Sequence, residues 1–269
     1  MHIIIHRGQI NQMIIKNYIY KSKFLSSILA FLFEIFFFLK NKKKIRIYFK
    51  DDFWIHESPY GKFAYMHPVR SVEHHLLYLL PVHLKSYSPK VDDIIFDIGA
   101  GIGNEVIYLS KLVGKNGKIF AVEANPKVYS YLLETIKINK LENVIPLNIA
   151  IYDDNEKNIN FSSSEFSWLG GTVDNSGDIL VKTKTLDQII LDHNLKRVNF
   201  AKFNIEGAEK YLITGGKNFN NICQNYCISC HDFLGIPDCR THDDINSFLK
   251  NSFFQILKEN RTGINYLDS

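Results

Sequence analysis

The sequence has only four cysteines, all within the stretch from Cys223 to Cys239, and this excludes a disulfide framework across the chain. Their spacing, C-x3-C-x2-C-x8-C with His231 alongside, leaves two interpretations open: a zinc site, or reduced structural cysteines in a reducing compartment. Alternate residues of a strand point to opposite faces, so Cys227 and Cys230 would converge poorly on one ion. The second interpretation is favoured, and we predict no metal.

A strong charge of either sign is also absent, since 32 Lys and Arg face 28 Asp and Glu, a net charge of +4. The positive and negative charges are, however, unevenly distributed along the chain. Residues 1–50 hold ten basic residues and one acid, a net charge of +9, whereas residues 51–269 carry 22 basic and 27 acidic residues, a net charge of −5. A main domain that wraps nucleic acid needs a basic surface, so we predict no nucleic-acid partner.

No apolar run is long enough to span a bilayer comfortably. Residues 24–39 would form a helix of about 24 Å against a hydrocarbon core of about 30 Å, and Glu34 interrupts the run before KNKKKIR at residues 40–46. Three interpretations stay open: a helix bound to the membrane surface through residues 24–46, a short signal anchor, or a helix packed against the body or a second subunit. We expect a cytoplasmic protein, peripheral at the inner membrane face under the first interpretation.

From residue 91 onward, short apolar runs alternate with helical periodicity, which predicts a mostly parallel α/β sheet with helices on both faces. We divide the chain into a basic apolar helical segment (1–44), an entry segment (45–90) and an α/β domain (91–269). The predicted strands are 94–98, 118–123, 144–151, 158–161, 180–184, 198–205, 226–231 and 253–257. The predicted helices are 105–112, one starting at 126, 186–191, 208–213 and 243–249.

A glycine-rich turn follows the first predicted strand and reads Asp97-Ile98-Gly99-Ala100-Gly101-Ile102-Gly103. Glycines there let the backbone turn sharply and let a ligand approach closely. Asn104 occupies the third glycine position of a dinucleotide fingerprint, which disfavours a nicotinamide-dependent oxidoreductase. Glu123 ends the next strand, where a carboxylate can accept hydrogen bonds from both hydroxyls of a ribose.

The order D-x-G-x-G-x-G followed by a ribose-binding acid resembles the class I S-adenosylmethionine (SAM)-dependent methyltransferases. Further blocks resemble the FkbM-type family in particular over residues 91–232: AVEANP (121–126), NIAI (148–151), KTLD (184–187) and KFNIEGAE (202–209). The chain departs from the family's phrasing at Gly101, Ala124 and Asn204, which stand where an Asn, a Pro and an Asp are usual. The resemblance implies a Rossmann-like fold with a mostly parallel seven-stranded sheet, and SAM as cofactor.

The resemblance also implies residue roles. Asp97 and Gly99 would lie near the methionine part of the cofactor, Glu123 near its ribose, and Asn125 with residues 148–151 near its adenine. The expected cofactor-binding residues are Asp97, Gly99, Gly101, Gly103, Glu123, Asn125, Asn148 and Ala150. The candidates for a base or an acceptor-orienting group are Glu206, His231 and Asn204, and the loss of a carboxylate at Asn204 puts its role in doubt.

The acceptor follows from the family alone: a small molecule or glycan, methylated on a hydroxyl of a sugar, a glycolipid or a secondary metabolite. Two alternatives to these assignments stay open, one for a single residue and one for the whole protein. Glu206 could merely stabilise the start of the following helix. The protein could also be a non-catalytic, membrane-associated SAM-binding protein, a hypothesis motivated by Asn204.

Overall fold

The computed structural model describes residues 22–41, 44–68, 75–162, 172–173, 177, 179–232, 240–252 and 254–256. The chain divides into two compact units, Met1–His74 and His75–Ser269. This division falls inside the segment delimited from sequence as residues 45–90.

The first unit is a helix packed on a small antiparallel sheet. Its elements are α2 (Lys23–Asn41), β1 (Arg46–Lys50), β2 (Phe53–Ser58) and β3 (Gly61–Tyr65), and the strands pair in the order β1-β2-β3. Ala30 and Phe37 of the helix form a buried cluster with Ile45, Ile47 and Trp54. The helix therefore has one face packed on the segment that follows it. Among the described residues, no helix is both long and apolar enough to cross a membrane.

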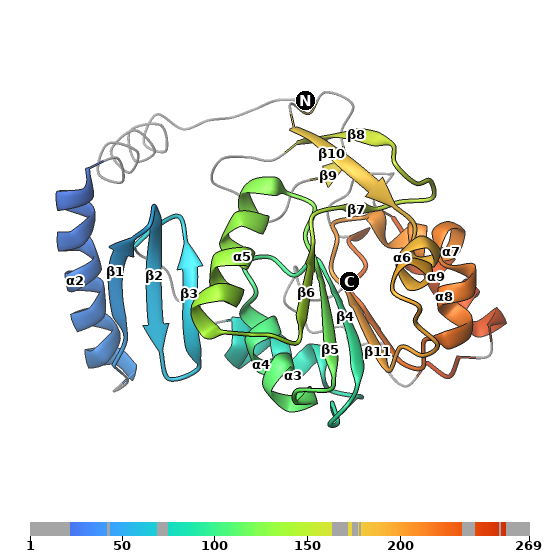
Figure 1. Cartoon of the computed structure of the whole chain (residues 1–269), viewed down its shortest axis with the longest axis horizontal. Coiled ribbons are helices and arrows are strands. Elements are labelled where there is room, and N and C mark those ends of the chain that lie inside the picture. The colour runs from blue at the N-terminus through green and yellow to red at the C-terminus, as the bar shows by residue number, and fades with distance from the viewer. Residues whose placement is uncertain are drawn as a thin grey trace. The chain divides into compact units, whose positions relative to one another are not determined.

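The second unit is built on a central sheet of five parallel strands in the order β12-β11-β4-β5-β6 (Figure 1). In chain order, β4 starts in the middle, β5 and β6 extend one half, and β11 and β12 return to extend the other. The strand order thus reverses between β4 and β11, and ligands of such sheets bind at the carboxyl ends of the strands at this point. The strands are β4 (Ile94–Ile98), β5 (Lys118–Val122), β6 (Val144–Leu147), β11 (Phe200–Phe203) and β12 (Tyr226–Ile228).

Helices cover both faces of this sheet, as expected for buried parallel strands. On one side lie η1 (His75–Leu79), α3 (Leu80–His83), α4 (Asn104–Val113) and α5 (Pro126–Asn139). The other side carries α6 (Leu186–Asp192), α7 (Tyr211–Gly215), α8 (Lys217–Ile222) and α9 (His242–Asn251), and the short helix η2 (Ala208–Lys210) leads into α7.

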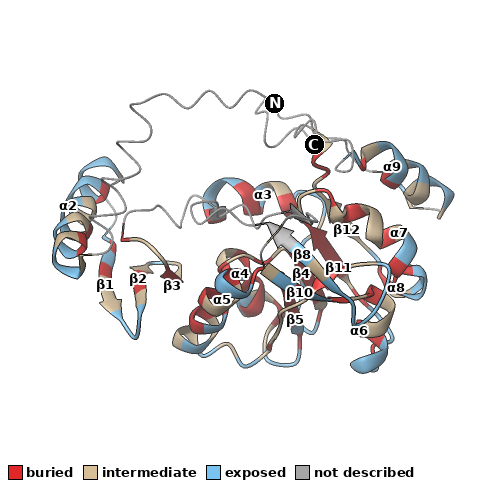
Figure 2. Cartoon of the chain, turned by 90° about the horizontal axis from the view of Figure 1, so that it is seen from above, coloured by how far each residue is buried: buried red, intermediate tan, exposed pale blue. Residues whose placement is uncertain are grey.

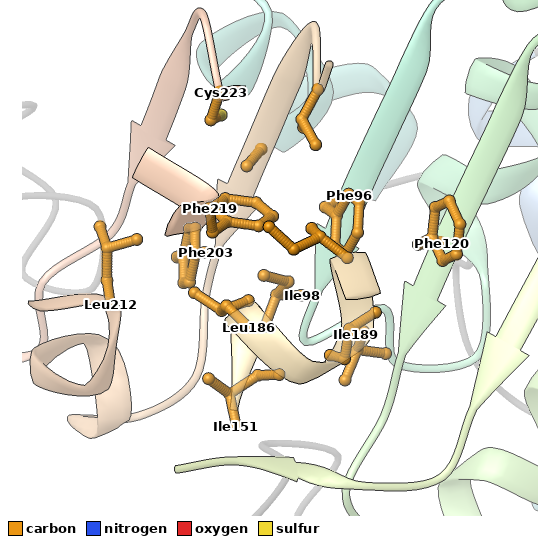
Figure 3. Packing of buried hydrophobic residues seen from close by; sticks show 14 of the residues in the cluster. Phe96, Ile98, Phe120, Ile151, Leu186, Ile189, Phe203, Leu212, Phe219 and Cys223 are labelled. Carbon is orange, nitrogen blue, oxygen red and sulfur yellow. The ribbon is translucent and has the colours of Figure 1, made fainter. Parts of the chain in front are cut away.

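Successive side chains of β4 point to opposite faces of the sheet, because side chains alternate along a strand. Phe96 and Ile98 pack with Leu186, Ile189 and other residues of α6–α8 (Figure 3). Ile95 instead packs in the cluster formed with α4 and α5. Asp97 shares the Ile95 face, so the alternation places a carboxylate inside an apolar layer.

The α/β fold with a central parallel sheet is confirmed, but the strand count is not: the described part of the central sheet has five strands, not seven. The strands predicted over 158–161 and 180–184 instead belong to a separate sheet, β7-β10-β8-β9, from β7 (Ala150–Ile151), β8 (Asn158–Ser162), β9 (Thr172–Val173) and β10 (Ile179–Lys184). The strand predicted over 144–151 breaks at Asn148, whose side chain binds backbone carbonyls beyond β5. The chain then leaves the central sheet, and β7 pairs with β10.

Two further predictions differ at the carboxyl end. The strand predicted over 253–257 is not formed at residues 254–256, and its first and last residues lie outside the described part. The strand predicted over 198–205 is limited to β11, because the chain after Phe203 turns through residues with positive φ at Glu206 and Gly207.

Candidate active site

The glycine turn after β4 combines close packing with one open position. Gly99, Gly101 and Gly103 have φ of 81°, 57° and 87°, in the left-handed region that favours glycine. A Cβ on Gly99 would lie 2.0 Å from the carbonyl oxygen of Asn204, and one on Gly103 would lie 2.8 Å from Leu132 Cδ1. A Cβ on Gly101 would have no neighbour within 4 Å. Gly99 and Gly103 are therefore packing positions, and Gly101 borders open space.

A buried ion pair underlies this turn. Lys202 Nζ lies 2.8 Å from Asp97 Oδ1 and also donates to the carbonyl oxygen of Gly99 at 3.0 Å. The two residues are paired in register on the neighbouring strands β11 and β4, on the same face. Burial lowers the pKa of Lys202, but the carboxylates of Asp97 and Glu105 outweigh it, so the net pKa is raised and Lys202 stays protonated. Asp97 Oδ2 is buried and accepts no hydrogen bond from the described residues.

Two more charged or ionisable side chains extend this cluster into the helices. Glu105 in α4 and His83 in α3 are both buried, and His83 Nδ1 lies 2.7 Å from Glu105 Oε1. Sequence reasoning missed Lys202, Glu105 and His83. Lys202 opens the block KFNIEGAE, so a charged residue within an otherwise apolar strand was the available signal.

Glu123 lies directly after β5, and its carboxylate holds the glycine turn from the other side. Oε2 accepts from the backbone N–H of Gly101 at 3.0 Å, and Oε1 accepts from that of Asn125 at 2.9 Å. Burial raises the pKa of Glu123 to about 7, against the lowering effect of these two hydrogen bonds. The carboxylate therefore changes its charge near neutral pH.

The remaining cofactor candidates form local hydrogen bonds or pack. Asn125 Oδ1 accepts from the backbone N–H of Lys127 and Val128, which caps α5. Asn148 Nδ2 donates to the carbonyl oxygens of Glu123 and Ala124 at 2.8 and 3.0 Å. Ala150 is buried in β7. Their proximity to adenine stays a prediction.

The structure brings two of the three catalytic candidates together. His231 Nε2 lies 3.7 Å from Glu206 Oε1, and His231 Nδ1 lies 2.9 Å from Glu209 Oε1. Glu209 is fully buried and also accepts from the backbone N–H of Ile205 and from the hydroxyl of Thr241. Sequence reasoning missed Glu209, although it lies three residues after Glu206 in the same block. Glu206, His231 and Glu209 therefore form a row in which the imidazole lies between two carboxyl groups, and we call it the acid–imidazole row.

The pKa values of Glu206 and His231 are both raised, but for different reasons. Burial raises the pKa of Glu206, and the positive charge of His231 opposes that rise only in part. Burial lowers the pKa of His231, but the hydrogen bond and charge of Glu209 and the charge of Glu206 prevail and raise it. Glu206 also has φ of 56°, a conformation that costs a non-glycine residue about 1–3 kcal/mol. Such strain is typical of functional sites.

Asn204 directly follows β11 and lies in the sequence between Lys202 of the buried ion pair and Glu206. Its backbone N–H donates to the carbonyl oxygen of Ile98, and its own carbonyl oxygen faces Gly99. The turn that carries Glu206 is thus packed directly on the glycine turn. Asp232 binds the start of α9, since its carboxylate accepts hydrogen bonds from the backbone N–H groups of Thr241 and His242.

Three of the four cysteines lie in β12 or within three residues of it. Cys223, Cys227 and Cys230 are free, and burial raises the pKa of each thiol to about 12. Cys239 lies outside the described residues. Within the described part of the chain, no group of three or more His, Cys, Asp and Glu side chains could hold a metal ion.

A parallel sheet in this order, with a glycine turn after its first strand and an acid after its second, is the arrangement of α/β proteins that bind a nucleoside-containing cofactor, a class to which the SAM-dependent methyltransferases belong. Residues 97–256, more than half of the chain, match the family described as the methyltransferase FkbM domain. The chain belongs to this family.

Individual relatives are distant and are matched only in part. The chain is 27% identical over 129 residues to the hexuronic acid methyltransferase AglP of Haloferax volcanii, covering 47% of this chain and 51% of that relative. It is 46% identical over 56 residues to the tRNA(Phe) (4-demethylwyosine(37)-C(7)) aminocarboxypropyltransferase of Methanocaldococcus jannaschii, covering 21% and 22%. The solved structure of the methyltransferase FkbM from Methylobacillus flagellatus has 17% identity and a TM-score of 0.40, covering 60% of this chain and 37% of that one.

Two glycine substitutions should affect different properties, Gly99→Ala mainly folding and Gly101→Ala mainly cofactor binding. Gly99→Ala should destabilise the fold by about 2–4 kcal/mol, because its Cβ would collide with the backbone of Asn204. Gly101→Ala should cost about 1 kcal/mol for its left-handed backbone, and should weaken SAM binding about tenfold or more by filling the open position. Denaturant unfolding and calorimetric titration measure the two quantities. Equal SAM affinity in Gly101→Ala and the unchanged protein would remove Gly101 from the cofactor site.

Proposed function

We propose that the protein is an O-methyltransferase that transfers a methyl group from SAM to a hydroxyl of a sugar, a glycolipid or a secondary metabolite. The observation that carries this proposal is the row Glu206–His231–Glu209, set on a turn packed against the glycine turn. It offers an acid of raised pKa beside the place where this class of fold binds its cofactor.

The residues present fit SAM. Gly101 borders open space, Asp97 has a buried oxygen with no hydrogen bond from the described residues, and the Glu123 carboxylate ends the second strand. In this proposal Glu123 accepts from the ribose hydroxyls, Asp97 and Gly99 face the methionine part, and Asn125, Asn148 and Ala150 border the adenine. When bound, SAM supplies a methyl group on a sulfonium for in-line displacement.

The chain's own contribution is positioning and removal of one proton. A hydroxyl that becomes a methyl ether loses its proton, and Glu206 is the group we assign as general base, because it lies beside His231 on the turn packed against the glycine turn and because burial raises its pKa, which makes its carboxylate a stronger base. His231 is a positioning residue that orients Glu206, and Glu209 holds His231 through Nδ1. The Asn204 amide can orient the acceptor but cannot take its proton.

A hydroxyl acceptor is supported by charge and by one relative. Residues 51–269, which include the whole second unit, carry a net charge of −5, which opposes binding of a polyanion. AglP is named for methylation of a hexuronic acid. Other relatives are named as tRNA-modifying enzymes, so RNA belongs in the test as the competing acceptor.

A second candidate function rests on Asn204, which stands where the family usually has Asp. If that carboxylate were indispensable, the protein would bind SAM without transferring its methyl group. A labelling experiment separates the two functions. The protein is incubated with methyl-labelled SAM and with oligosaccharides, glycolipids or tRNA as acceptors, and the products are identified by mass spectrometry. A labelled methyl ether supports the proposal. Label on a nucleobase, or SAM binding with no labelled product, contradicts it.

Glu206→Gln should lower kcat about 10²–10⁴-fold, the usual contribution of a general base, and leave SAM affinity within about threefold. Glu209→Gln should cost less, about tenfold, because it disturbs only the orientation of His231. Steady-state kinetics on the labelled acceptor and calorimetry measure both effects. The matched control is Glu142→Gln, on an exposed residue, which should leave both quantities unchanged. Full activity in Glu206→Gln would rule out this base.

SAM affinity should depend on pH through Glu123. The ionised carboxylate accepts ribose hydroxyls better, so cofactor binding lowers the pKa of about 7 and releases a proton below it. Affinity should therefore rise with pH by up to about tenfold per unit and level off above about 7. Calorimetry from about pH 5 to 7.5 tests this slope. The Glu123→Gln variant should bind weakly without that slope, and an unchanged slope in this variant would exclude Glu123 as its source.

A further inference from the structure

Helix α2 has two faces of different character. Its inner face is packed: Ser26, Ala30 and Phe37 are buried, and their spacings of four and seven residues place them on one side of a helix. This face rests on the sheet of the first unit through Ile47 and Trp54. Packing on the first unit therefore uses only part of the helix surface.

The one acid of the helix belongs to this inner side. Glu34 Oε1 accepts a hydrogen bond of 2.5 Å from the backbone N–H of Ile47 in β1, the edge strand of the sheet. Its carboxylate is thus bound to the backbone of β1. In the sequence Glu34 interrupts an apolar run, but in the structure it anchors the helix to its sheet.

The outer face is apolar and exposed. Figure 2 shows exposed positions over much of α2. Eight of its large apolar side chains are exposed: Phe24, Ile28, Phe31, Leu32, Ile35, Phe36, Phe38 and Leu39. Single exposed apolar residues are ordinary, but a contiguous face of this kind marks an interaction surface.

Basic side chains border this outer face. Lys40 lies at the carboxyl end of the helix, and Lys44 and Arg46 are exposed just beyond it, whereas the ammonium of Lys23 at the other end lies 4.5 Å from the ring centre of Phe49 in β1. The Lys40 ammonium lies 5.9 Å from the ring centre of Phe36, so its stem follows the apolar face. Between residues 22 and 50, Glu34 is the one acid in the sequence. The rim therefore carries a single sign of charge.

We propose that α2 docks the protein on an anionic lipid bilayer, with the helix lying in the interface and its outer face among the acyl chains. An apolar face with a lysine rim fits this partner, because the lipid tails take the aromatic side chains and the anionic headgroups attract the ammonium groups. A second copy fits less well, since two-fold pairing would bring the same lysines together. This inference is independent of methyl transfer.

Vesicle flotation of the full-length chain tests the docking. The protein should bind vesicles of phosphatidylglycerol and phosphatidylcholine in equal parts, and should bind pure phosphatidylcholine about tenfold less. High salt should weaken binding to the anionic vesicles. Phe31→Ser with Phe36→Ser should reduce binding about tenfold or more, and because both side chains are exposed, the melting temperature should not change.

The matched control replaces two exposed leucines of the second unit, Leu133→Ser with Leu191→Ser, which should bind as the unchanged protein does. Failure of the full chain to bind anionic vesicles would overturn the proposal, as would equal binding by both double variants. Light scattering without lipid covers the remaining alternative. If the unchanged protein formed a dimer and the Phe31→Ser, Phe36→Ser double variant did not, the outer face would be assigned to a second copy of the chain.

Discussion

The ion pair between Lys202 and Asp97 is the interaction on which the rest of the site depends. Two charges are placed inside an apolar layer, a costly arrangement unless each is paired. The pair joins β4 to β11 at the point where the strand order reverses, and the second hydrogen bond of Lys202 fixes the carbonyl of Gly99. Lys202 thus sets the start of the glycine turn.

From this start, packing contacts link the cofactor side to the acid–imidazole row. Gly99 packs on the backbone of Asn204, and two residues later Glu206 takes its left-handed conformation opposite His231. Glu209, buried behind them, holds the imidazole. The first unit also uses an acid as a link, since the half-buried Glu34 ties α2 to the backbone of β1 and leaves the outer face of the helix apolar.

Features with local causes could be predicted from the sequence, and those made by distant residues could not. The strand 94–98 and the helix starting at Pro126 follow from an apolar run and from an Asn-Pro cap. The partners Asp97 and Lys202 lie 105 residues apart, so no spacing rule joins them. The chain leaves the central sheet at Asn148, whose side chain donates to backbone carbonyls just beyond β5. The periodicity of apolar residues carries no information about these hydrogen bonds, so the break could not be predicted from it.

Calorimetric titration with SAM of two variants, Lys202→Met alone and combined with Asp97→Asn, tests the central claim. Lys202→Met should lose about 3–5 kcal/mol of unfolding free energy, since it leaves a buried carboxylate unpaired, and the double variant should recover most of it. Both should bind SAM at least about tenfold more weakly, because neither can hold the Gly99 carbonyl. A folded double variant that binds SAM as tightly as the unchanged protein would contradict the account.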